Sequence, residues 1–179
     1  MNPRETLLAF DAFLGSRALR LDAVIIGGAA LNLLGIVQRP TRDCDVLHPK
    51  IPPDVLTAAR EFAMATRSAG TPLDDDWLNN GPQSLVDQLP PGWDLRLQDI
   101  LSGTSMRIRC LGRIDLLRSK LFALCDRATD LLDCVAMAPT ADELDLVMPW
   151  LTYQDANPDW PDHVRTTMSD LRARCGLGL

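Results

Sequence analysis

One segment, residues 23–47, constrains the fold of this 179-residue chain more than any other. It begins with a short apolar run that ends in two consecutive glycines, Gly27 and Gly28. A second apolar run follows, and then an alternating stretch over residues 43–47. Apolar runs that glycines interrupt in this way predict a strand, a tight turn, a short helix over about residues 29–35 and a second strand.

Two aspartates, Asp43 and Asp45, stand two positions apart in the second expected strand. Because successive side chains of a strand alternate between its faces, both carboxylates would project from one side. Two carboxylates about 6 Å apart repel by about 3 kcal/mol at an effective dielectric constant of about 20, and a cation between them relieves that repulsion. Magnesium favours carboxylate oxygens together with substrate phosphates, so the pair predicts a magnesium site, with manganese as the alternative ion.

The two glycines predict a phosphate-binding turn beside these acids. Gly27 and Gly28 can adopt positive φ angles, and their missing Cβ lets a ligand approach the backbone closely. The N–H groups and positive dipole end of the following helix would point at the same place. Phosphate-binding and metal-binding groups in one cleft are what the transfer of a nucleotidyl group requires.

The same residues carry a resemblance to a known superfamily. Gly27-Gly28-Ala29-Ala30-Leu31, followed by Arg39-Pro40-Thr41-Arg42-Asp43-Cys44-Asp45-Val46, resembles the nucleotidyltransferases with the DNA polymerase β-like fold. Within that superfamily, the chain is most similar to the small prokaryotic branch that contains the AbiEii and MenT toxins. A second block resembles the helical Lys…Arg…Asp-x-x-Asp motif of this branch. Its matching residues are Lys120, Arg127, Asp130 and Asp133.

The resemblance implies a role for each matching residue. Asp43 and Asp45 would hold one or two magnesium ions at the α-phosphate of a nucleoside triphosphate and at the leaving pyrophosphate. The glycine turn would bind the β- and γ-phosphates, and Arg39 would add its planar, charged fork to the same anion. Thr41 would hold the loop by local hydrogen bonding. Lys120 would be a second cation at the triphosphate, or else a lysine whose stem lines the core edge while its head stays in water.

Members of this superfamily usually carry a third carboxylate on a later strand. Alternating patterns predict later strands over about residues 93–98 and 105–111. Asp94 is the only acidic residue within either of them, so it is the candidate third catalytic acid, with a surface strand residue as the alternative. Without a third acid, a second metal ion would be weakly held, catalysis would be slow or absent, and a binding role would become credible.

Composition bounds the class of protein. The apolar fraction is 46%, which is typical of globular domains, and the formal net charge is −6, which argues against a large nucleic-acid footprint. No apolar run is long enough to span a membrane and the first residues lack a signal-peptide pattern, so we expect a cytoplasmic protein with no membrane partner. The five cysteines form no Cys-x-x-Cys pair and predict buried, reduced thiols rather than a zinc site.

Strand patterns early in the chain and helical patterns late predict an α+β fold. We expect a nucleotidyltransferase-like mixed sheet of about four to five strands with flanking helices. Residues 1–112 would form the nucleotidyltransferase core, and residues 113–179 a C-terminal helical part packed on that core, the alternative being one single domain. Pro139, Pro158 and Pro161 mark the expected breaks between the late helices.

Three functions fit this sequence. The first is a magnesium-dependent nucleotidyltransferase that modifies RNA, as a toxin with a cognate antitoxin protein would. The second is a nucleotidyltransferase that modifies a protein or a small molecule. The third is a catalytically degenerate member that binds nucleotide or a partner protein. The acidic pI of about 4.8 weighs against the first. The nucleotide, the acceptor and the oligomeric state cannot be read from the sequence.

Overall fold

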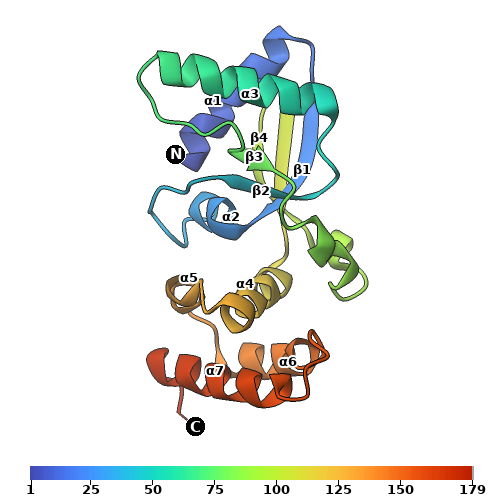
Figure 1. Cartoon of the computed structure of the whole chain (residues 1–179), viewed down its shortest axis with the longest axis vertical. Helices are drawn as coiled ribbons and strands as arrows, with labels where there is room; N and C mark the ends of the chain where they lie inside the picture. Colours follow the sequence, from blue (N-terminus) through green and yellow to red (C-terminus); the bar gives the residue numbers. More distant parts are fainter. Residues whose placement is uncertain (179) are drawn as a thin grey trace. The chain divides into compact units, whose positions relative to one another are not determined.

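The computed structural model describes residues 1–178. The chain divides into two compact units, and the boundary along the chain lies between Gly112 and Arg113. The first unit, drawn from blue to yellow in Figure 1, carries every strand of the described residues. The second unit, drawn from gold to red, is helical. Among residues 1–178, no helix combines the length and the apolar character that crossing a membrane would take.

The first unit contains helices together with the strands of one mixed sheet. Its elements are α1 (Pro3–Ser16), β1 (Leu21–Ile26), α2 (Gly27–Leu33), β2 (Cys44–His48), α3 (Pro53–Ser68), β3 (Leu78–Asn79), the 3₁₀ helices η1 (Gln83–Asp87) and η2 (Trp93–Arg96), β4 (Gln98–Ser102) and β5 (Met106–Cys110). The second unit consists of α4 (Arg113–Arg127), α5 (Leu131–Ala136), α6 (Ala141–Leu151) and α7 (Trp160–Arg174).

The five strands form one mixed sheet in the order β3-β2-β1-β5-β4. β1 pairs with β5 and β2 pairs with β3 in parallel, whereas β1–β2 and β4–β5 are antiparallel. The predicted α+β class and mixed sheet with flanking helices are therefore confirmed. β1 lies at the centre of the sheet, so the glycine turn that follows it begins at the middle of one sheet edge.

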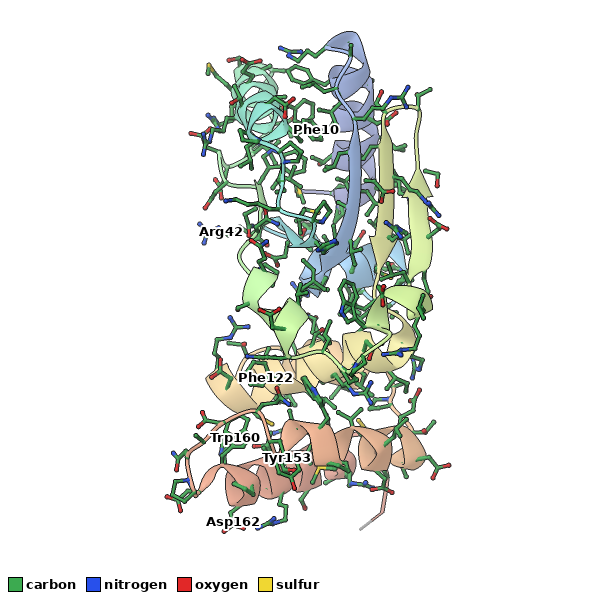
Figure 2. The ribbon with its side chains drawn as sticks, turned by 90° about the vertical axis from the view of Figure 1, so that its right-hand side faces the viewer. Phe10, Arg42, Phe122, Tyr153, Trp160 and Asp162 are labelled. Atoms are coloured by element: carbon green, nitrogen blue, oxygen red, sulfur yellow. The ribbon has the colours of Figure 1, made fainter. Side chains whose placement is uncertain are left out.

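One face of this sheet is buried beneath helices, as the period-two pattern of β5 shows. Met106, Ile108 and Cys110 are buried, while Arg107 and Arg109 point to the opposite face. The core over the buried face is aromatic and comes from α1, α3 and the segment before β3, and Figure 2 shows Phe10 within it. Its rings are Phe10, Phe13, Phe62 and Trp77, and the Phe10 and Trp77 centroids lie 5.1 Å apart, edge to face.

The strand expected over residues 93–98 is wrong. Residues Trp93–Arg96 form the 3₁₀ helix η2, and the strand that pairs with β5 begins later, at Gln98. The preceding prolines and Gly92, whose φ is +78°, turn the chain, and Leu95 N donates to Gly92 O at 3.1 Å. An alternation of apolar and charged residues over five positions also fits an exposed turn, and Leu95 is indeed 87% exposed.

The second unit packs its helices around an aromatic group of its own. Phe122 on α4 lies 6.2 Å from Trp160 and 6.3 Å from Trp150, measured between ring centroids, and Figure 2 labels Phe122 and Trp160 there. Trp160 Nε1 donates to Leu151 O at 2.9 Å, which satisfies the indole when it is buried. Thr140 and Glu143 form a capping box that starts α6. These contacts give the unit its own apolar core.

A buried carboxylate joins α1 to the hairpin between β4 and β5. Asp11, only 7% exposed, accepts hydrogen bonds from Ser105 N at 2.8 Å and from the Thr104 N and Oγ1 atoms at 3.1 and 3.3 Å. Burial alone would raise the pKa of Asp11, but these hydrogen bonds from the backbone and from Thr104 lower it below its usual value. The hairpin turn is therefore held by a charged acceptor.

We predict that Asp11→Asn lowers the free energy of unfolding by about 1.5–3 kcal/mol, the usual range for hydrogen bonds to a charged group. Because folding lowers the pKa of Asp11, its stabilisation is complete above the unfolded-state pKa of about 4 and disappears as the pH falls through the folded-state value. Denaturant unfolding at pH 7 and at pH 3 measures this. Asp22→Asn, at an exposed acid on β1, is the matched control, and an equal loss in both variants would contradict the prediction.

Candidate functional site

Asp45 occupies the middle of the first unit's candidate site. It lies on β2, in register with Ile26 at the end of β1 and with Asn79 on β3. Its neighbours Cys44 and Val46 are fully buried, so the half-buried Asp45 side chain points to the opposite face of the sheet. The sheet thereby places one carboxylate directly beside the turn that ends β1.

Gly27 makes room for this carboxylate. Its φ is +75°, and a Cβ added to it would lie 2.8 Å from Asp45 Oδ2, which is closer than side-chain carbons and oxygens approach. The glycine is thus required twice, by its backbone conformation and by the carboxylate against it. The first glycine of the motif and the second aspartate lie side by side.

Gly28 makes a similar contact with the loop before β2. A Cβ on Gly28 would lie 2.9 Å from Thr41 Cγ2. Thr41 is only 7% exposed; its Oγ1 donates to Asp43 O at 3.1 Å, and its backbone N donates to Met1 O at 3.0 Å. These contacts pack the loop that carries Asp43 closely against the glycine turn.

Asp43 precedes β2 rather than belonging to it, and it is half-buried. Cys44, between the two acids, faces the core, as predicted. Burial raises the pKa of its thiol far above the usual value, and the charges of Asp45 and Asp43 raise it further. A neutral, buried thiol is no metal ligand, so the donors of this segment are carboxylate oxygens. Such donors fit a hard cation such as Mg²⁺ or Mn²⁺ and not Zn²⁺.

The two arginines of the motif lie at the surface of the first unit. Arg39 is exposed in the loop between α2 and β2, where Asn32 Nδ2 donates to the Arg39 carbonyl at 3.1 Å. Arg42 points outward in Figure 2 and pairs with Asp74 at 3.4 Å. Of the two, Arg39 is the one whose backbone is tied to α2.

Asp94 is not a strand acid. It lies on η2 and is exposed, so the reason for assigning it as the third carboxylate, a place on a later strand, is wrong. The face that Asp45 shares with β5 carries Arg107 and Arg109 instead, paired with Asp99 at 2.7 Å and Asp22 at 2.8 Å. Within residues 1–178, no group of three or more His, Cys, Asp or Glu side chains is arranged to hold a metal ion.

Lys120 belongs to the second unit, where it forms a buried charge cluster. The residue is 4% exposed, and its Nζ lies 2.7 Å from Asp133 Oδ2 and 3.2 Å from Asp130 Oδ1. Asp133 is 1% exposed, and Asp130 takes a φ of +66° just before α5. A lysine with its head in water does not describe this arrangement. The motif residues Lys120, Asp130 and Asp133 are in contact, and their charges compensate one another.

Three residues of the segment after Trp77, on β3 and in the turn that follows it, were not expected at the site. Asn79 pairs with Asp45, and a Cβ on Gly81 would lie 3.9 Å from Asp45 Oδ1. Asn80 supports the end of β2, since its Nδ2 donates to Val46 O and Pro49 O at 2.9 and 3.1 Å. The only signal in the sequence is the dipeptide Asn-Asn followed by Gly, which predicts a turn but not its location.

We predict that Lys120→Met lowers the free energy of unfolding by about 3–5 kcal/mol, because it removes the ammonium group that pairs with the buried Asp133. Lys50→Met is the matched control, since Lys50 is exposed and is the other lysine of the chain. Combining Lys120→Met with Asp133→Leu should recover much of the loss. Denaturant unfolding measures all four proteins, and a Lys120→Met variant as stable as Lys50→Met would contradict the buried cluster.

Comparison with known families agrees with these motifs. No curated protein and no solved structure matches the chain. A family model described as a nucleotidyltransferase of unknown function (DUF6036) matches residues 5–148. This range includes the glycine turn, Asp43 and Asp45, and also Lys120 and Asp133. Because the match covers well over half of the sequence, the chain belongs to this family of nucleotidyltransferases.

Proposed function

We propose that this protein transfers a nucleoside monophosphate from a nucleoside triphosphate to an acceptor, and that magnesium or manganese at Asp45 and Asp43 assists the transfer. The observation that carries the proposal is the close approach of the Asp45 carboxylate to Gly27. A carboxylate against an open glycine turn offers metal-binding oxygens and accessible backbone at one place. Membership of a nucleotidyltransferase family gives that place its most direct interpretation.

Each residue of the first unit has a defined task in this proposal. Asp45 and Asp43 bind and orient the cation, which when bound neutralises charge on the reacting phosphate and on the leaving pyrophosphate. Gly27 admits phosphate oxygens close to the backbone. Because α2 has only seven residues, this task rests on the glycine backbone and not on the dipole of a long helix. Arg39 adds charge at the phosphates, and Thr41 keeps Asp43 next to the turn.

For the acceptor we propose RNA, because the two motif blocks resemble the AbiEii and MenT toxin branch. The net charge of −6 limits the contact to a short stretch such as an RNA end. The described arginines on the sheet face, Arg107 and Arg109, are paired with acids and would have to exchange those partners for phosphates. In this proposal a cognate antitoxin protein is the natural partner.

A second function is favoured by one specific observation. Residues 1–178 contain no three-membered group of acidic, histidine or cysteine side chains that could hold a metal ion. With two carboxylates, a second cation would be held weakly, which lowers the rate of the chemical step more than it lowers nucleotide affinity. The second candidate is therefore a protein that binds nucleotide with magnesium but does not transfer it.

We predict that the protein labels RNA when it is incubated with total cellular RNA, magnesium and one of the four nucleoside triphosphates labelled at the α-phosphate. Asp45→Asn should abolish the transfer because the cation loses a charged ligand, whereas Asp170→Asn, at an exposed acid on α7, should retain it. Gel electrophoresis followed by nuclease or protease treatment identifies the labelled acceptor.

Each outcome of this experiment separates two functions. Label on protein or on a small molecule would keep the transferase and replace RNA as acceptor. Nucleotide binding that depends on Asp45, without any transfer, would favour the binding protein. Neither binding nor transfer with any of the four nucleotides would contradict both candidates.

A further inference from the structure

Asn79 is the nearest strand neighbour of Asp45 that carries a polar side chain. β3 is only two residues long, and its second residue, Asn79, pairs with Asp45 across the parallel β2–β3 ladder. Paired residues on adjacent strands project from the same face of a sheet. The Asn79 side chain is half-buried, as is that of Asp45. The amide and the carboxylate therefore lie next to one another on the open side of the sheet.

The position of Gly81 places both side-chain oxygens near one point. A Cβ added to Gly81 would lie 2.9 Å from Asn79 Oδ1 and 3.9 Å from Asp45 Oδ1, so both oxygens lie within 4 Å of one point. Gly81 has no side chain to fill that point, and Gly81 itself is exposed to solvent. The other oxygen of Asp45, Oδ2, faces Gly27. A ligand at Asp45 Oδ1 would thus lie on the side of the sheet that also carries Asn79 Oδ1.

Hydrogen bonds fix which end of the Asn79 amide faces Gly81. Gly81 N donates to Asn79 Oδ1 at 2.7 Å, and Asn79 Nδ2 donates to Asp76 O at 3.4 Å. The reverse orientation would place the amide NH₂ against the Gly81 N–H, donor against donor. Because a carbonyl oxygen has two lone pairs, Oδ1 retains one after it has accepted from Gly81 N. That oxygen is oriented before any ligand arrives.

We propose that Asn79 Oδ1 is an uncharged oxygen donor to the divalent cation that Asp45 binds. The inference rests on the proposed function, since it assumes a cation at Asp45. It gives the site a third oxygen-bearing side chain, which comes from β3. Residues 1–178 contain no group of three or more His, Cys, Asp or Glu side chains that could hold a metal ion. A neutral amide in this position keeps the local charge lower than a third carboxylate would, and the affinity for a divalent cation accordingly lower.

Titration with Mn²⁺, followed by the electron paramagnetic resonance signal of the free ion, tests this without measuring activity. Asn79→Asp should raise the Mn²⁺ affinity by about tenfold, because the number of charged ligands tunes the affinity of such sites. Asn79→Ala should lower it by about fivefold, by removing one oxygen. Thermal unfolding in the absence of metal shows that each variant is folded.

Asn157→Asp is a closely matched control. Asn157 is exposed, and its Oδ1 accepts a hydrogen bond from Asp159 N, two residues along the chain, as Asn79 Oδ1 does from Gly81 N. The two substitutions thus make the same change of charge at the same kind of turn. Asn157→Asp should leave the Mn²⁺ affinity unchanged.

Failure of this inference can be told from failure of the proposed function. If Asp45→Asn removes Mn²⁺ binding but Asn79→Asp behaves like Asn157→Asp, or Asn79→Ala like the wild type, Asn79 is not a ligand and the inference alone is overturned. If Asp45→Asn leaves Mn²⁺ binding unchanged, the proposed cation site is itself wrong, and the role of Asn79 is overturned with it.

Discussion

The contact between the Asp45 carboxylate and Gly27 is the constraint on which the candidate site depends. Gly27 and Gly35 have the same φ of +75°, but a Cβ on Gly35 would meet nothing within 4 Å, whereas a Cβ on Gly27 would meet Asp45 Oδ2 at 2.8 Å. Both glycines permit the positive φ angle, but of the two only Gly27 also leaves space for a carboxylate. The register of β1 and β2, which pairs Ile26 with Asp45, produces this contact.

The charges of the two units serve different ends. In the first unit, Asp45 is half-buried on the open side of the sheet, where a cation from solvent can compensate its charge. In the second, Lys120 and Asp133 are buried and compensate one another within hydrogen-bonding distance. Desolvating both partners is costly, so such a pair is retained only where its geometry is well satisfied. In the proposed function the first unit supplies the ligand-binding chemistry, whereas Lys120 and Asp133 of the second unit form an internal ion pair.

The features of the fold and the site that could be predicted from the sequence are those that a few neighbouring residues encode. The glycine turn and the alternating acids could each be read from the sequence, because each signal is encoded within a few neighbouring residues. Their contact depends on the register of β1 and β2. Asn79 could not, since a two-residue strand has no period and its position depends on distant partners. Asp94 was misassigned because its short alternation also fits an exposed 3₁₀ turn. The burial of Lys120 depends on its ion pair with Asp133, and sequence spacing alone does not determine that contact.

The central claim is that Asp45 and the Gly27 turn bind a nucleoside triphosphate with magnesium, and thermal unfolding with and without these ligands tests it most directly. Ligand at about 100 times its Kd should add about 2.7 kcal/mol to the free energy of unfolding of the wild type. Gly35→Ala should keep that gain and Gly27→Ala should lose it, although both substitutions strain the same backbone conformation. No ligand-dependent gain in the wild type, or an equal gain in the two variants, would contradict the claim.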